Sequence, residues 1–171
     1  FDVETGAFLA DGFELPESKG GAQWADLSGD RLLVARDFGA GSMTTSGYPR
    51  SVRLWQRGTP LSEATELFTA EQTDMGVWSH HDFTEGYEHT FLMRMVAFYE
   101  ADFYLLDADN ASQRLDIPRH SEPNLHRQWL FVEPREAWEV GGQKHAAGSL
   151  LAIELRRFLG GARDFETLFT P

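Results

Sequence analysis

Two serines follow a glycine and are the first candidates for a nucleophile, Ser42 after Gly41 and Ser149 after Gly148. A serine hydrolase of the α/β type holds its nucleophile on a sharp strand-to-helix turn whose sequence is Gly-x-Ser-x-Gly. The chain contains no such string. We expect Ser42 in a loop between strands and Ser149 at the start of a strand, where no helix follows to stabilise an oxyanion. Neither serine is therefore expected to be a nucleophile.

A second candidate is the run His80, His81 and Asp82, with Glu85 or His89 as a further metal ligand. Adjacent residues of a strand point to opposite faces, so the two histidines are poorly placed to bind one ion. We expect polar residues of the surface or of a channel wall. The alternative is that one histidine faces a channel mouth and meets a substrate or a neighbouring domain.

The remaining motifs give weaker evidence for a functional site. The run from Asp107 to Asn110 begins like a calcium loop but lacks the glycine and the final glutamate of an EF-hand, so we expect a hairpin turn. Asn110 also opens a three-residue glycosylation sequon of a kind that arises often by chance. Glycosidase carboxylates cannot be singled out among 27 acidic residues. We assign no catalytic, cofactor-binding or metal-binding residue and expect no cofactor.

The segment from Asp37 to Arg50 contains three glycines, Pro49 and several hydroxyl residues. This composition predicts a shaped loop between strands, with special backbone angles at the glycines. The triplet that opens it, Asp37, Phe38 and Gly39, also occurs in protein kinases, but no glycine-rich nucleotide loop or catalytic-loop signature accompanies it here. The kinase match is accidental.

Four similar short segments determine how these residues are positioned. They recur at offsets of 54, 48 and 53 residues and begin at Phe13, Leu67, Leu115 and Leu168. A repeat of roughly 40 to 50 residues, filled with short apolar strands, is typical of a β-propeller built blade by blade. The fold class is therefore all-β.

We divide the chain into an outer half blade (residues 1–16) and three four-stranded antiparallel blades (21–70, 75–118 and 121–171). Alternating apolar and polar residues, separated by turn residues, predict the strands. Residues 134–148 form a hairpin of their own in this scheme, and at most one short helical turn lies near 156–161. The clearest predicted strands are 31–36, 51–56, 90–98, 103–106, 114–117, 128–133 and 149–155.

Trp24 and Trp78 lie 54 residues apart on the first predicted strand of two blades. The first strand of a blade lines the central channel, while successive sheets pack face to face through large apolar side chains. We expect the two tryptophans to occupy equivalent places and to pack between sheets.

Composition limits the partners. The chain has 15 basic and 27 acidic residues, a formal net charge of −12, which makes nucleic acid and anionic membranes poor partners. No stretch reaches the roughly 18 apolar residues of a membrane helix. There is no cysteine, which fits a bacterial cytoplasm and a periplasm equally well.

About three and a half blades fit into 171 residues, whereas propellers have about four to eight. The chain also begins with Phe1, inside a strand-like run. We therefore expect a fragment of a propeller whose exposed blade edges can support self-association.

Several segments resemble the propeller of bacterial prolyl oligopeptidase-family enzymes. They are residues 24–61, including the loop 37–50 and the run from Leu54 to Leu61, residues 90–92 with 96–99, and residues 148–153. The resemblance covers essentially the whole chain. It implies a two-domain serine peptidase in which an α/β-hydrolase domain carries the Ser-Asp-His triad and a seven-bladed propeller admits only short peptides.

No triad segment is present, so the resemblance transfers no catalytic residue and implies that this chain by itself is inert. The first hypothesis is the substrate-gating propeller portion of a peptidase that cleaves short proline-containing peptides. Its partner is then the α/β-hydrolase domain of the same parent chain. The alternative is a free-standing propeller-type module that binds a protein.

Overall fold

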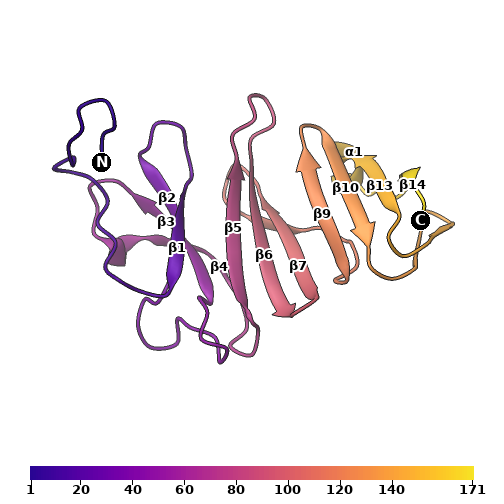
Figure 1. Cartoon of the computed structure of the whole chain (residues 1–171), viewed down its shortest axis with the longest axis horizontal. Coiled ribbons are helices and arrows are strands. Elements are labelled where there is room, and N and C mark those ends of the chain that lie inside the picture. The colour runs from indigo at the N-terminus through magenta and orange to yellow at the C-terminus, as the bar shows by residue number, and fades with distance from the viewer.

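The computed structural model describes all 171 residues and consists of three four-stranded antiparallel sheets that lie side by side (Figure 1). The first sheet contains β1 (Gly20–Trp24), β2 (Arg31–Arg36), β3 (Ser51–Gln56) and β4 (Thr65–Thr69). The second contains β5 (Gly76–Asp82), β6 (His89–Ala97), β7 (Glu100–Leu106) and β8 (Ser112–Arg114). The third contains β9 (Ser121–His126), β10 (Trp129–Pro134), β13 (Leu150–Glu154) and β14 (Glu166–Phe169).

Three smaller elements complete the chain. The two-stranded hairpin of β11 (Trp138–Val140) and β12 (Gln143–His145) is inserted between β10 and β13. A single 3-10 turn, η1 (Leu61–Glu63), precedes β4, and the helix α1 (Leu155–Leu159) follows β13. Neither helix is long and apolar enough to cross a membrane.

The predicted all-β partial propeller is confirmed, since the strands of each sheet follow one another in chain order. β2 and β3 have the predicted bounds, and α1 begins within a residue of the predicted helical turn. The strand predicted at 114–117 ends earlier, because β8 stops at Arg114. The N–H of Leu115 still donates to Phe103 of β7, but the N–H of Ile117 donates to Leu115 and turns the chain away.

Residues 1–16, predicted as half a blade, form no strand here, and their one bridge joins Asp2 to Ala7. A half blade needs partner strands with which to pair, and no other segment of this chain pairs with these residues. Phe13 instead packs against the outer face of the first sheet, with its ring 4.7 Å from that of Trp55. The assignment of residues 1–16 to a blade stays a prediction.

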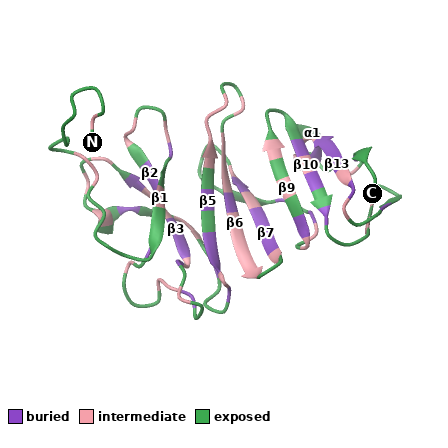
Figure 2. Ribbon diagram, viewed as in Figure 1, coloured by how far each residue is buried: buried purple, intermediate pink, exposed green.

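The core is formed between the sheets, and the ribbon coloured by burial shows buried residues along their strands (Figure 2). On β7, Ala101, Phe103 and Leu105 face the third sheet, and the alternate residues Tyr104 and Leu106 face the first. Both faces of the second sheet are therefore covered, as expected for successive propeller blades. The cluster between the second and third sheets is the larger of the two, with 12 buried residues against 6.

The two tryptophans do not occupy equivalent places. Trp24 pairs with Leu32 and lies on the outer face of the first sheet beside Phe13, whereas Trp78 pairs with Met93, which faces the third sheet. They are 50% and 37% exposed, so the prediction that both pack between sheets is wrong. Adjacent residues of a strand point to opposite faces, and on β5 it is Val77 and Ser79, at offsets of 53 and 55 residues from Trp24, that face the first sheet. An offset of 54 residues therefore reaches the opposite face.

An ion-pair network fixes the second sheet. The carboxylate of Asp102 on β7, whose side chain is 2% exposed, accepts hydrogen bonds from Arg114 at 2.7 Å and Arg119 at 2.9 Å. Arg94 on β6 lies 3.8 Å from the same carboxylate and donates to Asp74, in the connection between the first two sheets, at 2.7 Å. Burial opposes ionisation of Asp102, but hydrogen bonds and charge from Arg119 and Arg114 outweigh it and lower its pKa.

We expect Asp102→Asn to lower the free energy of unfolding at pH 7 by about 2 kcal/mol, because it removes the buried carboxylate that pairs with Arg114 and Arg119. The pKa of Asp102 is lower in the folded chain than in the unfolded chain. Its ion pairs therefore stabilise the fold fully above the unfolded-state pKa of about 3.9, and this contribution is lost as the pH falls through the folded-state pKa. Urea unfolding at a series of pH values measures both effects.

Asp109→Asn is the matched control, since Asp109 is exposed in the turn before β8 and its carboxylate makes no ion pair. The control should unfold like the parent chain at every pH. Equal stability of Asp102→Asn and the control at pH 7 would show that the network does not stabilise the second sheet.

Candidate functional site

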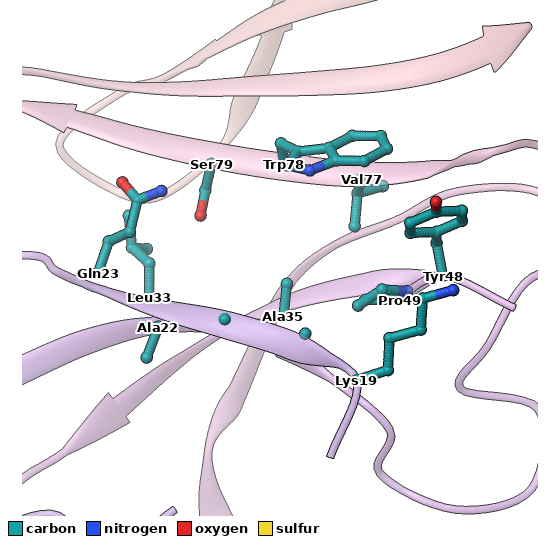
Figure 3. A pocket seen from close by; sticks show the side chains of 12 residues that line it. Lys19, Ala22, Gln23, Leu33, Ala35, Tyr48, Pro49, Val77, Trp78 and Ser79 are labelled. Atoms are coloured by element: carbon teal, nitrogen blue, oxygen red, sulfur yellow. The ribbon is translucent and has the colours of Figure 1, made fainter. Parts of the chain in front are cut away.

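A slot lies between β1 and β5, the first strands of the first two sheets (Figure 3). Both are edge strands, free on the side away from their own sheet. The slot encloses about 330 Å³, at the lower end of the range of ligand pockets. Its lining is Lys19, Gly20 to Gln23, Leu33, Ala35, Tyr48, Pro49, and Val77 to Ser79.

The floor of the slot is apolar. Leu33 and Ala35 point from the first sheet toward β5, and Val77 points from β5 toward the first sheet (Figure 3). Leu33 and Val77 belong to the core cluster between these sheets, so the floor is held by the fold itself. The hydroxyl of Ser79 and the amide of Gln23 supply polar groups in the lining.

Two glycines of β1 shape the slot in different ways. Gly20 has φ +143°, and a Cβ there would lie 2.2 Å from the carbonyl oxygen of Ala35, so the backbone requires glycine. At Gly21 a Cβ would meet nothing within 4 Å. Gly21 pairs with Ala35 across the sheet and shares its face, so its missing side chain leaves room in the slot.

The predicted shaped loop 37–50 connects β2 to β3 within the first sheet and reaches the start of the second sheet. The hydroxyl of Thr44 donates to the carbonyl of Met75 at 3.1 Å, and Nε of Arg50 donates to that of Ala70 at 2.6 Å. The N–H of Val77 donates to the carbonyl of Pro49 at 3.1 Å. These bonds fix the end of the loop against the start of β5 and so bring Tyr48 to the slot.

Tyr48 forms an aromatic rim, with its ring centroid 5.9 Å from that of Trp78, whose indole lies on the face of β5 away from the first sheet (Figure 3). The ammonium of Lys19 lies 3.7 Å from the centroid of the Tyr48 ring, a cation–π contact. No carboxylate pairs with this ammonium, and Lys19 is the one charged residue of the lining. The slot thus combines an apolar floor, an aromatic rim and an available positive charge.

The surroundings of the two candidate serines indicate a structural role. The hydroxyl of Ser42 accepts from the N–H of Phe38 at 2.8 Å and donates within the loop to Asp37 at 2.9 Å. Ser149 is buried. No hydrogen bond joins either hydroxyl to a histidine, so the fold supplies no base for either.

The two neighbouring histidines lie on opposite faces of β5, as the strand geometry predicts. The ring of His81 is hydrogen-bonded to Thr90 at 2.8 Å, and burial lowers its pKa. His80 lines a second slot of about 240 Å³ with Asp82, His89 and residues of β9. No group of three or more acidic, histidine or cysteine residues is placed to hold a metal ion.

The expected hairpin turn after β7 is present. The carboxylate of Asp107 accepts from the N–H groups of Asp109 and Ala111, each at 2.9 Å, and Asn110 has φ +63°. An aspartate that hydrogen-bonds its own turn in this way needs no ion.

The slot was not predicted from the sequence, because its parts are 60 residues apart in the chain, from Lys19 to Ser79. Trp78 and the loop that holds Tyr48 were identified, but not their contact. The pair Gly20 and Gly21 at the start of a strand is the one local signal, since consecutive glycines are unusual in a strand.

Comparison with known proteins identifies peptidases. No family model matches the chain. A protein described as an uncharacterized peptidase of Sinorhizobium fredii is 35% identical over 75 residues, which are 44% of this chain and 10% of the relative. Another uncharacterized peptidase, from Rickettsia prowazekii, is 25% identical over 100% of this chain and 26% of its own length. A solved structure of a post-proline cleaving enzyme from Rickettsia typhi matches 100% of this chain and 27% of that one, with a TM-score of 0.88 at 23% identity.

The predicted resemblance to prolyl oligopeptidase-family peptidases is thereby confirmed, and the structural match shows a shared fold along the whole chain. The chain spans about a quarter of the length of the second relative and of the solved enzyme, and a tenth of the first relative.

The two glycines of β1 should respond differently to substitution. Gly20→Ala forces a Cβ against the Ala35 carbonyl at a φ that alanine avoids, and we expect a loss of about 2 kcal/mol in the free energy of unfolding. Gly21→Ala should change it by less than about 0.5 kcal/mol, because its Cβ enters open space. Urea unfolding measures both variants, and a destabilised Gly21→Ala would mean that the slot is closed.

Proposed function

We propose that this chain is a substrate-gating portion of the propeller of a prolyl oligopeptidase-like serine peptidase, which cleaves short proline-containing peptides with a catalytic domain outside these residues. The observation that carries the proposal is the match of the whole chain to part of a post-proline cleaving enzyme. The two relatives described as peptidases support it and favour it over a free-standing binding module.

The packed sheets give gating a physical basis. Leu92, between the first two sheets, and Leu130, between the second and third, are almost fully buried. A wall packed in this way resists opening, because separating its sheets exposes apolar surface to water. The two slots along β5 enclose about 330 and 240 Å³, so they admit a residue or two and no folded protein. Selection by size follows from such a wall without any chemical step.

The test compares this chain with the longer protein that contains it, using a chromogenic anilide whose acyl group ends in Gly-Pro. We expect the longer protein to release the anilide and the 171-residue chain to release none, since neither Ser42 nor Ser149 has a base beside it. The longer protein should also cleave a short proline-containing peptide and leave a folded protein intact.

The matched control is the anilide that ends in Gly-Ala, which the longer protein should cleave much more slowly. Hydrolysis by the 171-residue chain that a serine-directed inhibitor blocks would exclude the proposal. A longer protein that cleaves neither anilide would exclude it as well.

Self-association stays a prediction. The third sheet leaves an apolar face uncovered, where Trp129 is 39% and Phe169 57% exposed. Exposed apolar surface and free strand edges favour association between copies. We expect the purified 171-residue chain to form dimers or larger species at tens of micromolar, as measured by light scattering. A strict monomer would contradict this expectation.

A further inference from the structure

We propose that the slot between β1 and β5 binds the carboxyl-terminal end of a short peptide, with a proline ring against the Tyr48 rim and the free carboxylate at Lys19. The proposal rests on the proposed function, because a peptide cut after proline has such an end.

The charge of the slot selects the ligand. The protein carries a net charge of −12, yet no carboxylate lines the slot, and its one charged group is the ammonium of Lys19. That ammonium has no ion-pair partner and is held 3.7 Å from the Tyr48 ring centroid. A carboxylate is the group that such a site attracts, whereas a positively charged peptide end meets repulsion.

The floor and the rim of the slot select the residue that carries the carboxylate. Val77, Leu33 and Ala35 offer apolar surface, and Tyr48 offers aromatic surface. Aromatic-lined grooves recognise proline-rich peptides because the ring is rigid and loses little conformational entropy on binding. The volume of about 330 Å³ suits one or two residues. A proline that carries the terminal carboxylate satisfies all three features.

The experiment measures binding of acetyl-Ala-Pro with a free carboxylate to the 171-residue chain by calorimetry. Two further probes separate the contributions of the carboxylate and of the proline ring. They are the same peptide as an amide and acetyl-Ala-Ala as the acid. We expect the proline acid to bind most tightly, about three- to fivefold more tightly than its amide at low ionic strength, since an exposed ion pair contributes modestly. Added salt should reduce this difference.

Nuclear magnetic resonance locates the ligand. The chain has five tryptophans, and the indole N–H signal of Trp78 should shift on addition of the proline acid, with Trp78→Phe identifying that signal. Trp129 is exposed to nearly the same degree and lies on the third sheet, away from the slot, so its signal should stay in place.

Three variants test the assignment, each checked for folding by circular dichroism. Lys19→Gln should reduce affinity for the acid to that for the amide and leave amide binding unchanged, while Lys19→Arg should retain the preference. Gly21→Leu should abolish binding of both, because its side chain enters the slot without meeting the backbone. Trp129→Ala, a control on the third sheet away from the slot, should bind normally.

Equal affinity for acid and amide in the parent chain would overturn the proposal, as would full binding by Gly21→Leu. Binding is measured without hydrolysis, so its failure is separate from failure of the proposed function. A longer protein that cleaves after proline, with no binding at the slot, refutes the slot alone. Specific binding of the proline acid, with no cleavage by the longer protein, refutes the proposed function alone.

Discussion

The structure depends on sheets that bury apolar side chains against one another. Leu130 and Val132 of β10 and Leu151 and Ile153 of β13 are almost fully buried, and all four face the second sheet. The second sheet packs against a neighbouring sheet on each face. Successive residues of β7 therefore belong alternately to one apolar cluster and to the other. The chain has too little helix to cover the apolar faces of these sheets, so the buried faces pack against another sheet. The arrangement of blades therefore follows from where apolar surface can leave water.

The same constraint creates the slot. Apolar contacts hold the first two sheets together at Leu33 and Val77, but Gly20 and Gly21 supply no side chains to fill the space beside β1. The loop 37–50 would be free to move if it belonged to the first sheet alone. Its hydrogen bonds to Met75 and Val77 attach it to the second sheet as well. Tyr48 is thus placed by contacts with two blades, and the shape of the site depends on both.

Electrostatics adds a second link between the first two blades. Asp74 lies in their connection, where its carboxylate accepts from Arg94 and from the N–H of Glu71. Arg94 in turn lies near Asp102, which Arg114 and Arg119 also contact. Buried charges of this kind are tolerated only when they are paired, and here the pairing fixes how β6, β7 and β8 meet the connection. Apolar contacts hold the sheets face to face, and the ion pairs hold the second sheet to the connection that leads into it.

The amino-acid sequence by itself determined the strands and their repeat, because period-two alternation and turn residues are local properties of the chain. It therefore predicted β2, β3, the inserted hairpin and the opposite faces of His80 and His81 correctly. It placed Trp24 and Trp78 on equivalent faces wrongly, since the face of a strand residue depends on its register in its own sheet and not on the offset between repeats. Only the tertiary structure decided that Lys19, Tyr48 and Trp78 meet. Their contact depends on the distance between two sheets, and that distance is set by side chains packed together from both.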